Sequence, residues 1–354
     1  MGPGVTAPSL TGVENACRFG HHAPCQARPP ETRHRFAMPL LDVHNLTTYF
    51  FTAGGLVKAV RGVDFAIGEG ETLALVGESG CGKSMTALSL LRLVPSPGRI
   101  VDGKIFFAGE DLRLIPEDEM RRLRGNQIAM IFQEPMTALN PVFRIGEQVG
   151  EVLRLHKGLE VREAFDAAIE LLHQVGIPSP ERRARDYPHH LSGGMRQRVV
   201  IAMALACDPR LLIADEPTTA LDVTIQAQIM DLLMQLKAER RMATLLITHD
   251  LGVVAQTADR VAVMYNGLIM EMGSVAAIFS AAAHPYTQGL LGCIPRLGEK
   301  KKRLAVIEGP APGSRHADAT LSFLDNCPGR FAPKRGHLPR LQEVEPGHWV
   351  RCWD

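Results

Sequence analysis

The chain has 354 residues, 45% of them apolar, and its 39 Lys and Arg nearly balance its 38 Asp and Glu, leaving a formal charge of +1. This composition suits one large domain with a smaller appendage and gives no sign of bulk nucleic-acid affinity. No apolar segment approaches the roughly 20 residues of a membrane span, no signal peptide is evident, and seven cysteines suit reduced thiols, so we expect a globular protein that stays in the cytoplasm.

Residues 1–37 are rich in Pro, Gly, Ala, His and Arg and lack a sustained hydrophobic period, so we expect a disordered extension. Cys17, His21, His22 and Cys25 lie in it and could be drawn as a metal site, but their spacing fits no zinc-ligand rule well. Strand-like patterning starts at Met38, a candidate for the true first residue. From there, short apolar segments such as 59–65 and 105–107 alternate with turns, which predicts an antiparallel sheet.

A glycine-rich loop, GESGCGKS, follows the apolar run 73–76, and this order of strand, loop and helix is typical of a nucleotide phosphate pocket. The glycines let backbone N–H groups converge on phosphate oxygens, the Lys83 ammonium can reach the terminal phosphates, and the Ser84 hydroxyl can coordinate Mg²⁺. An ordinary glycine turn is the alternative. The residues expected to touch the nucleotide here are Gly77, Ser79, Gly80, Cys81, Gly82, Lys83, Ser84 and Met85. Cys81 contributes its backbone, and we treat its thiol as incidental.

After Gln133 the pattern becomes helical. Asn140 can cap a helix, Pro141 suits a first helical position, and one apolar face ends near Gly176. The members of that face are Val161, Phe165, Ile169 and Leu172. We place a helical subdomain at about residues 135–195.

A second anion site is predicted at LSGGMRQR, residues 191–198, which precedes the apolar helical segment 199–207. Ser192, Gly193 and Gly194 lie where this helix begins, so their N–H groups and the helix dipole can bind a phosphate without a lysine.

The next apolar run, 211–214, reads as a buried parallel strand that delivers Asp215 and Glu216 to its carboxyl end, where ligands bind in such sheets. An acidic pair alone is more often a solvated strand end. With the phosphate loop present, we assign Asp215 to Mg²⁺ beside Ser84, and Glu216 to the attacking water.

These motifs resemble those of the ATPase subunit of ABC transporters, whose signature LSGGQ stands here as LSGGM. The resemblance implies an α/β fold: a P-loop NTPase core with an antiparallel β subdomain, an α-helical subdomain and a small C-terminal extension. In that family, the signature of one subunit closes over ATP held by the P-loop of another. Met195 in place of glutamine resembles the variant of peptide importers and should leave the serine and glycine contacts intact.

The resemblance also implies roles for single residues. Gln133 would touch Mg²⁺ and the water, and His249, after the apolar strand 243–247, would be the switch histidine at the γ-phosphate. Asp222 would lie in the loop that couples two ATP sites, and it also suits the N-cap of a helix from 223 to about 237. The implied catalytic residues are Lys83, Gln133, Glu216 and His249, and the implied metal ligands are Ser84, Gln133 and Asp215.

An aromatic residue should stack on adenine, and of the consecutive Tyr49, Phe50 and Phe51 the second fits the family best. We expect the other two to be core residues of a strand. Further on, the sequence YNG at 265–267 between two apolar runs predicts a β-hairpin.

Two segments narrow the class: EPMTALNP at 134–141 and HPYT at 284–287 resemble oligopeptide and dipeptide importers. That class carries peptides, nickel chelates or glutathione, and the sequence does not identify the solute. The implied partners are a second, homologous ATPase in a heterodimer, two transmembrane permease subunits and an extracytoplasmic solute-binding protein, with no nucleic acid. The implied location is peripheral, on the cytoplasmic face of the cell membrane.

We therefore expect an ABC ATPase domain at residues 38–298 and a peptide-importer type extension at 299–354. The tail from Lys300 has ten Lys or Arg against six Asp or Glu, which suits a solvated linker or contact with anionic lipid. Relatives hold an iron–sulfur cluster here with four cysteines. Because only Cys327 and Cys352 match, we expect no cluster.

The sequence thus predicts an ATP-hydrolysing subunit of an importer for peptides or related solutes, with ATP and Mg²⁺ as cofactors. One alternative is a soluble, non-transport ABC ATPase of translation or DNA repair, which would normally carry tandem domains or a long coiled-coil insertion. Another is a regulatory nucleotide-binding module without turnover, against which Lys83, Asp215, Glu216 and His249 argue.

Overall fold

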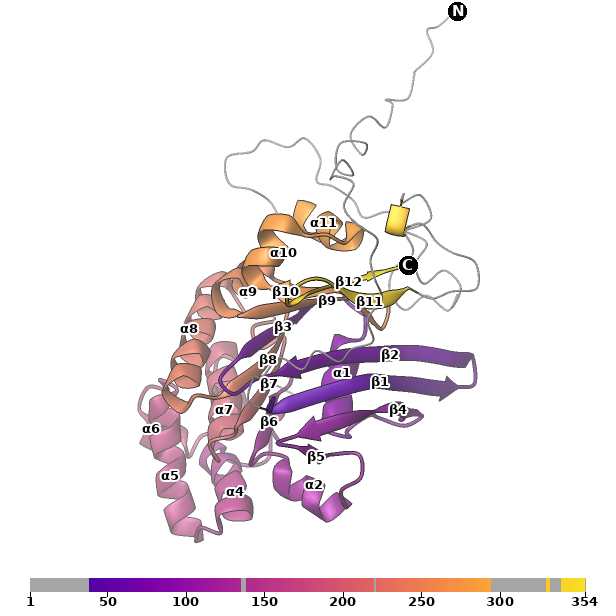
Figure 1. The fold of residues 1–354 in the computed structure, drawn as a ribbon. Coiled ribbons are helices and arrows are strands. Elements are labelled where there is room, and N and C mark those ends of the chain that lie inside the picture. The colour runs from indigo at the N-terminus through magenta and orange to yellow at the C-terminus, as the bar shows by residue number, and fades with distance from the viewer. Residues whose placement is uncertain (1–37, 135–137, 220, 294–328, 332–338, 354) are drawn as a thin grey trace, which may run out of the picture.

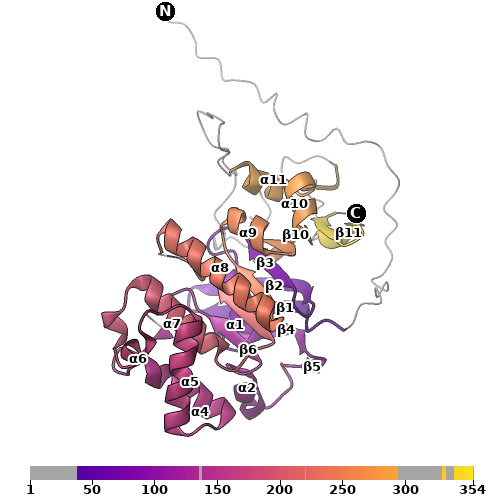
Figure 2. The same ribbon diagram turned by 90° about the vertical axis from the view of Figure 1, so that its left-hand side faces the viewer.

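Two sheets organise the computed structural model, which describes residues 38–134, 138–219, 221–293, 329–331 and 339–353. One sheet has four strands, and the other has eight (Figure 1). The helices between residues 145 and 183 gather at one end of the molecule, and those between 275 and 292 lie at the opposite end, as the turned view shows (Figure 2). Among the described residues, no helix has both the length and the apolar character needed to cross a bilayer. The predicted extension 1–37 lies outside the described residues.

The larger sheet is mixed, with strand order β11-β12-β10-β9-β3-β8-β7-β6. Its neighbouring parallel strands are β9 (Arg260–Tyr265), β3 (Thr72–Val76), β8 (Ala243–Ile247), β7 (Leu211–Asp215) and β6 (Ile128–Ile131). Every residue of β3 and β7 is buried, because packed elements cover both faces of the sheet. This double burial explains why these strands read as continuous apolar runs.

The smaller sheet is antiparallel, as predicted, with order β2-β1-β4-β5. Its strands are β1 (Leu41–Thr52), β2 (Gly55–Ile67), β4 (Gly98–Phe107) and β5 (Glu110–Asp111), and the short helix α2 (Glu117–Leu123) follows. Helix α1 (Lys83–Leu90) joins this sheet to the larger one, because Ala87 and Leu90 are buried in one apolar cluster with side chains of both sheets. The helix that follows the phosphate loop is therefore held between the two sheets.

A second apolar cluster covers the other face of the larger sheet. It includes side chains of α4 (Ile145–Lys157), α5 (Val161–Gln174), α7 (Gly193–Leu205) and α8 (Val223–Arg240). The short helices α6 (Pro180–Arg183) and η1 (Pro188–His190) connect α5 to α7. Helical structure between 145 and 190 agrees with the helical pattern of the sequence. Val161 is 63% exposed, however, so it is wrong as a member of the apolar face, which Phe165, Ile169 and Leu172 do form.

The predicted helix start at Asn140 and Pro141 is wrong. The Asn140 side-chain oxygen accepts a hydrogen bond from the Val142 N–H at 3.1 Å and forms a turn. Helix α4 begins at Ile145 instead, and the Glu147 carboxylate accepts from the Arg144 N–H at 3.0 Å. An asparagine followed by proline is compatible with a turn and with a helix N-cap, and in this structure the turn forms.

The C-terminal part extends the larger sheet. Strands β9 and β10 (Leu268–Ser274) form the predicted hairpin, and Asn266 and Gly267 of its turn have positive φ. After α10 (Val275–Ala281) and α11 (Pro285–Gly292) come the short helix η4 (Gly329–Phe331) and the hairpin of β11 (Arg340–Glu345) and β12 (His348–Cys352). Strand β12 pairs antiparallel with β10, so the tail adds two strands that the sequence pattern did not reveal.

Candidate nucleotide and phosphoryl-transfer site

The phosphate loop lies between β3 and α1, and its glycines are required by sterics. A Cβ added to Gly77 would collide with the Met264 carbonyl oxygen, and one added to Gly82 would collide with the Ala59 carbonyl oxygen. Both glycines also have positive φ, as does Gly80. The loop therefore passes so close to the neighbouring backbone that only glycine fits, which leaves its N–H groups available to anions.

The Lys83 side chain is buried under this loop. Its ammonium donates to the carbonyl oxygens of Gly77 and Glu78, each at 2.9 Å, and lies 3.7 Å from the Cys81 sulfur. Burial raises the pKa of the Cys81 thiol, and the nearby ammonium only partly offsets this effect. Cys81 is thus held as a neutral thiol, which agrees with the incidental role assigned to it.

The two residues assigned to Mg²⁺ meet across the sheet. The Ser84 hydroxyl donates to the Asp215 carboxylate at 3.1 Å, although 131 positions separate them in the chain. Burial raises the pKa of Asp215, the Glu216 charge raises it further, and Ser84 and Lys83 act in the opposite direction. A hydroxyl and a buried carboxylate side by side are oxygen ligands of the kind that Mg²⁺ prefers, so the residues fit this ion.

Glu216 gathers three further side chains. Its carboxylate accepts from the Gln133 amide nitrogen at 3.0 Å and from the Thr219 hydroxyl at 2.8 Å, and lies 3.4 Å from the His249 Nδ1 atom. The Glu216 backbone has φ of 46° and its N–H bonds to the Ile247 carbonyl oxygen at 2.9 Å. Gln133, Glu216 and His249, which the resemblance implies as site residues, are therefore brought together, and Thr219 joins them without having been predicted.

A cavity of about 520 Å³ opens beside this cluster. It is lined by Glu216, Thr218, Thr219, Leu221, Gln226, Thr248, His249, Asp250, Leu251, Gly252, Leu290 and Cys293. The last two come from the end of α11, and no sequence motif connected that segment with the site. His249 is 65% exposed, so its imidazole is accessible from this space.

The signature residues form a different site on the same chain. Ser192 caps α7, because its hydroxyl accepts from the Met195 N–H at 3.3 Å. Asp222 caps α8, because its carboxylate accepts from the Ile225 N–H at 2.9 Å. No hydrogen bond or ion pair of the described residues joins Ser192, Gly193 or Gly194 to the phosphate loop.

The three aromatic residues of β1 alternate between faces. Tyr49 lies near the Lys58 ammonium, and the Arg99 guanidinium lies 4.8 Å from the Phe51 ring centre. Phe50 pairs with Gly98 of β4, where an added Cβ would lie 2.7 Å from both the Phe50 ring and the Val94 side chain. The Phe50 ring therefore lies near Val94, a few residues after the end of α1. Phe51 is 46% exposed, so the expectation that it is a core residue is wrong.

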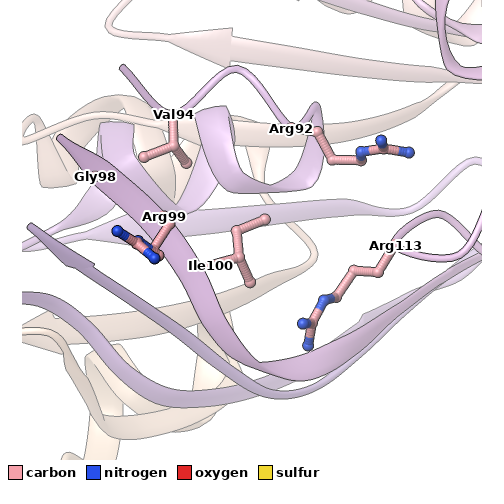
Figure 3. Close-up of a pocket in the computed structure, with 6 residues that line it drawn as sticks. All are labelled: Arg92, Val94, Gly98, Arg99, Ile100 and Arg113. Carbon is pink, nitrogen blue, oxygen red and sulfur yellow. The ribbon is translucent and has the colours of Figure 1, made fainter. Parts of the chain in front are cut away.

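A separate pocket of about 310 Å³ lies over β4, and Figure 3 shows its six residues. They are Arg92, Val94, Gly98, Arg99, Ile100 and Arg113. Two of these arginines donate to backbone carbonyl oxygens. Arg92 donates to those of Leu112 and Ile115, and Arg113 donates to that of Gly103. None of the residues assigned to the nucleotide lines this pocket, so its positive charge is not part of the phosphate site.

Of the two cysteines that match the cluster ligands of relatives, Cys352 is 3% exposed within β12, and Cys327 lies outside the described residues. Within the described ranges, no group of three or more His, Cys, Asp or Glu is arranged to hold a metal ion. The absence of an iron–sulfur cluster stays a prediction.

Comparison with known proteins agrees with this geometry. Residues 60–219 match the family described as ABC transporter, and residues 270–333 match the oligopeptide/dipeptide transporter C-terminal region. A probable peptide ABC transporter ATP-binding protein of Sinorhizobium fredii is 50% identical over 316 residues, which are 89% of this chain and 94% of that protein. A dipeptide transport ATP-binding protein of Bacillus subtilis is 49% identical over 315 residues, with 89% and 94% covered. An oligopeptide transport ATP-binding protein of Haemophilus influenzae is 48% identical over 316 residues, with 89% and 97% covered.

Solved structures resemble about two thirds of the chain. A dimeric ATP-binding cassette in a post-hydrolysis state, bound to ADP and phosphate, has a TM-score of 0.60 at 28% identity over 66% of this chain and 98% of that one. A subunit of an ABC transporter complex from Clostridium perfringens has a TM-score of 0.58 at 26% identity, covering 69% and 91%.

Proposed function

This chain belongs to the family of ABC transporter ATP-binding proteins, and from that membership we propose that it is the ATP-hydrolysing subunit of an importer for peptides or related solutes. The observation that carries the proposal is the set of contacts around Glu216, which has an amide, a hydroxyl and an imidazole within reach. The relatives named for peptide, dipeptide and oligopeptide transport are each covered over at least 94% of their length, which supports the solute class.

In the proposed reaction, Ser84 and Asp215 hold Mg²⁺, which supplies charge neutralisation for the phosphates when it is bound. The Lys83 ammonium leaves the carbonyl oxygens of Gly77 and Glu78 and turns to the terminal phosphates. The loop N–H groups and the start of α1 bind the remaining phosphate oxygens. Phe50 supplies a ring for adenine, as the family resemblance implies.

Glu216 orients the attacking water and accepts its proton. It can do so because it directly follows Asp215, which holds the metal in this proposal. Gln133 and Thr219 hold the Glu216 carboxylate through hydrogen bonds of 3.0 and 2.8 Å. His249 lies 3.4 Å from this carboxylate and lines the neighbouring cavity, which supports the role at the γ-phosphate that the resemblance implies. These side chains restrict the carboxylate to one orientation, and such positioning is a large part of catalysis in phosphoryl transfer.

The start of α7 provides the second half of a nucleotide site. As the family resemblance implies, we assign Ser192, Gly193 and Gly194 to ATP held by a second ATPase subunit; among the described residues, none of the three bonds to the phosphate loop of its own chain. The solved cassette that contains ADP and phosphate is a dimer, which supports this assignment. We propose that the second subunit is a homologous chain, and that the pair drives two permease subunits fed by an extracytoplasmic solute-binding protein. The chain would act as a peripheral protein at the cytoplasmic face of the membrane.

Replacement of Glu216 by glutamine tests the proposal in the complex reconstituted with its permease subunits in lipid vesicles. The wild-type complex is expected to hydrolyse ATP and accumulate a peptide from a panel of candidate solutes. The Glu216→Gln complex should bind ATP as before while turnover falls at least ~100-fold, as expected for loss of a positioned base. Lys83→Ala is the control, because it should weaken ATP binding itself. Undiminished turnover in Glu216→Gln removes the assignment, and ATP turnover with no solute moved removes the transport role.

A further inference from the structure

One hydrogen bond links the helix after Asp222 to the loop that carries His249. The Gln226 amide nitrogen donates to the Asp250 Oδ2 atom at 3.1 Å. Gln226 lies in the first turn of α8, and Asp250 directly follows His249 in the chain. Both side chains are half-buried and line the 520 Å³ cavity together with Glu216 and His249. The bond therefore joins two segments that border the proposed reaction site.

Asp250 is fixed by its other contacts. Its Oδ1 atom accepts from the N–H groups of Gly252 and Val253 at 2.8 and 3.2 Å, which caps α9 (Leu251–Thr257). Its own N–H donates to the Thr248 hydroxyl at 3.0 Å. The backbone on both sides of His249 is thus tied to Asp250, and a displacement of this carboxylate displaces the imidazole.

The first turn of α8 also contacts the signature. A Cβ added to Gly194 would lie 2.7 Å from the Ile225 Cγ2 atom, so the start of α7 and the start of α8 pack closely. Ile225 and Gln226 are consecutive: one contacts the signature helix, and the other bonds to the His249 loop. The first turn of α8 therefore contacts both the signature, which is assigned to the partner's nucleotide, and the His249 loop, which is assigned to the nucleotide of its own chain.

We propose that Gln226 is a positioning residue that couples the signature end of α8 to the His249 loop through Asp250. This role rests on the proposed function and deepens it. It names the contact through which binding of the signature to the partner's ATP aligns His249 at the ATP of its own chain. An engaged signature shifts the first turn of α8, and the Gln226 amide transmits that shift to Asp250. Interfaces between packed elements carry such shifts as discrete rearrangements.

The test is Gln226→Glu, alone and combined with Asp250→Asn, in the full-length protein assembled with its partner subunits. Gln226→Glu sets two carboxylates face to face and breaks the bond without changing side-chain size. We expect the kcat for ATP to fall at least ~10-fold while KM changes less than about 2-fold, because nucleotide binding does not use this contact. In the double variant, the introduced amide nitrogen at position 250 donates to the carboxylate at 226, and its oxygen still caps α9. That reversal should restore most of the lost kcat.

The pH profile supplies a readout that a purely structural role would not change. Two carboxylates that share a site bind a proton at raised pH, so activity of Gln226→Glu relative to wild type should rise as the pH falls from about 8 to about 6. His249 and Glu216 also face this cavity, so the wild-type profile is the baseline. The double variant should follow the wild-type profile.

Gln235→Glu is the matched control. Gln235 lies on the same helix and donates to the Glu239 carboxylate at 2.8 Å, but it is exposed and distant from the cavity lining. It should leave kcat unchanged.

Two outcomes overturn the coupling role: a wild-type kcat in Gln226→Glu, or an equal loss of kcat in the single and the double variant. Gln226→Met removes the amide without adding charge and decides the question if the glutamate variant does not fold. No turnover in the wild-type assembly would instead refute the proposed function.

Discussion

Two adjacent carboxylates, Asp215 and Glu216, have different surroundings and therefore different tasks. Asp215 is 4% exposed at the end of β7, and its pKa is raised chiefly by burial. Glu216 turns out of the strand with positive φ and receives two hydrogen bonds. The buried charge of Asp215 costs stability until a cation neutralises it. This difference leads to a prediction about stability and activity together.

Asp215→Asn should stabilise the nucleotide-free protein at pH 7 while abolishing ATP turnover that depends on Mg²⁺. The amide oxygen can still accept from Ser84, and a buried charge is removed. The gain should be on the order of 1 kcal/mol, a rise in Tm of about 2 °C for a domain of this size. A raised carboxyl pKa means that the folded state binds the proton more tightly, so the advantage of the variant should shrink as the pH is lowered.

Thermal melts of wild type and variant between pH 7 and pH 4 check this expectation. Asp231→Asn, an exposed change on α8, is the control and should leave Tm nearly unaltered at every pH. A lower Tm for Asp215→Asn at pH 7 would show that the carboxylate stabilises the empty site, contrary to the account.

Single residues of the site were largely predictable, because their motifs fix residue type and spacing. The phosphate loop, Asp215 and His249 follow apolar runs that the sequence reveals, whereas Gln133 was implied by the family resemblance. The contacts of Thr219 and Gln226 were not predictable, since a hydrogen bond across the fold leaves no local pattern in the chain.

Among the secondary-structure elements, regular strands were predicted better than their ends and edges. Strands β3, β7 and β8 are buried on both faces, and a continuous apolar run is their direct consequence. The start of α4 was misplaced because Asn140 has its own local turn. Strands β11 and β12 were missed because their burial depends on docking against β10, and half-buried edge strands have mixed composition.

A buried polar cluster fixes that docking. The Glu271 carboxylate is fully buried and accepts from the His348 ring at 2.7 Å and from the Ala283 and His284 N–H groups at 2.6 and 3.1 Å. His284 in turn caps α11, since its Nδ1 atom accepts from the Tyr286 N–H at 3.1 Å. One carboxylate thus holds both α11 and the C-terminal hairpin on β10.

His284→Asn should make the fold less sensitive to acid. Burial first, and the charges of Arg351 and Arg330 second, lower the pKa of His284 to about 3. Because the unfolded chain binds this proton near pH 6.5 and the folded chain does not, stability is lost as the pH falls from about 6.5 toward 3. Between pH 6.5 and 5 the loss attributable to this imidazole is about 2 kcal/mol, and the asparagine variant, which keeps a capping oxygen, should escape it.

The measurement is the change in Tm between pH 7 and pH 5, compared as a slope so that any packing loss in the variant cancels. His173→Asn, at an imidazole that is 72% exposed, is the control and should keep the wild-type slope. Equal slopes for His284→Asn and wild type would mean that the buried imidazole does not govern the acid response.

At the scale of the whole molecule, the two proposed anion-binding surfaces share no hydrogen bond among the described residues. One is the phosphate loop with Lys83, and the other is the start of α7 with Ser192. Their assignment to opposite sides of a shared nucleotide explains why a chain with one phosphate loop also has a glycine-rich helix start. The motifs of the sequence predict both surfaces, and the partner subunit that completes them belongs to the proposed function.

The most direct test of the account uses an ATP analogue with a photoreactive group on the γ-phosphate, bound to the full assembly carrying Glu216→Gln. A second assembly adds Lys83→Ala in this chain only, so that its own phosphate loop no longer retains the analogue. The account predicts that the segment around Ser192 is labelled equally in both, because its nucleotide is held by the partner subunit. Loss of that label in the Lys83→Ala assembly, or no label at Ser192 in either, would contradict a nucleotide shared between two subunits.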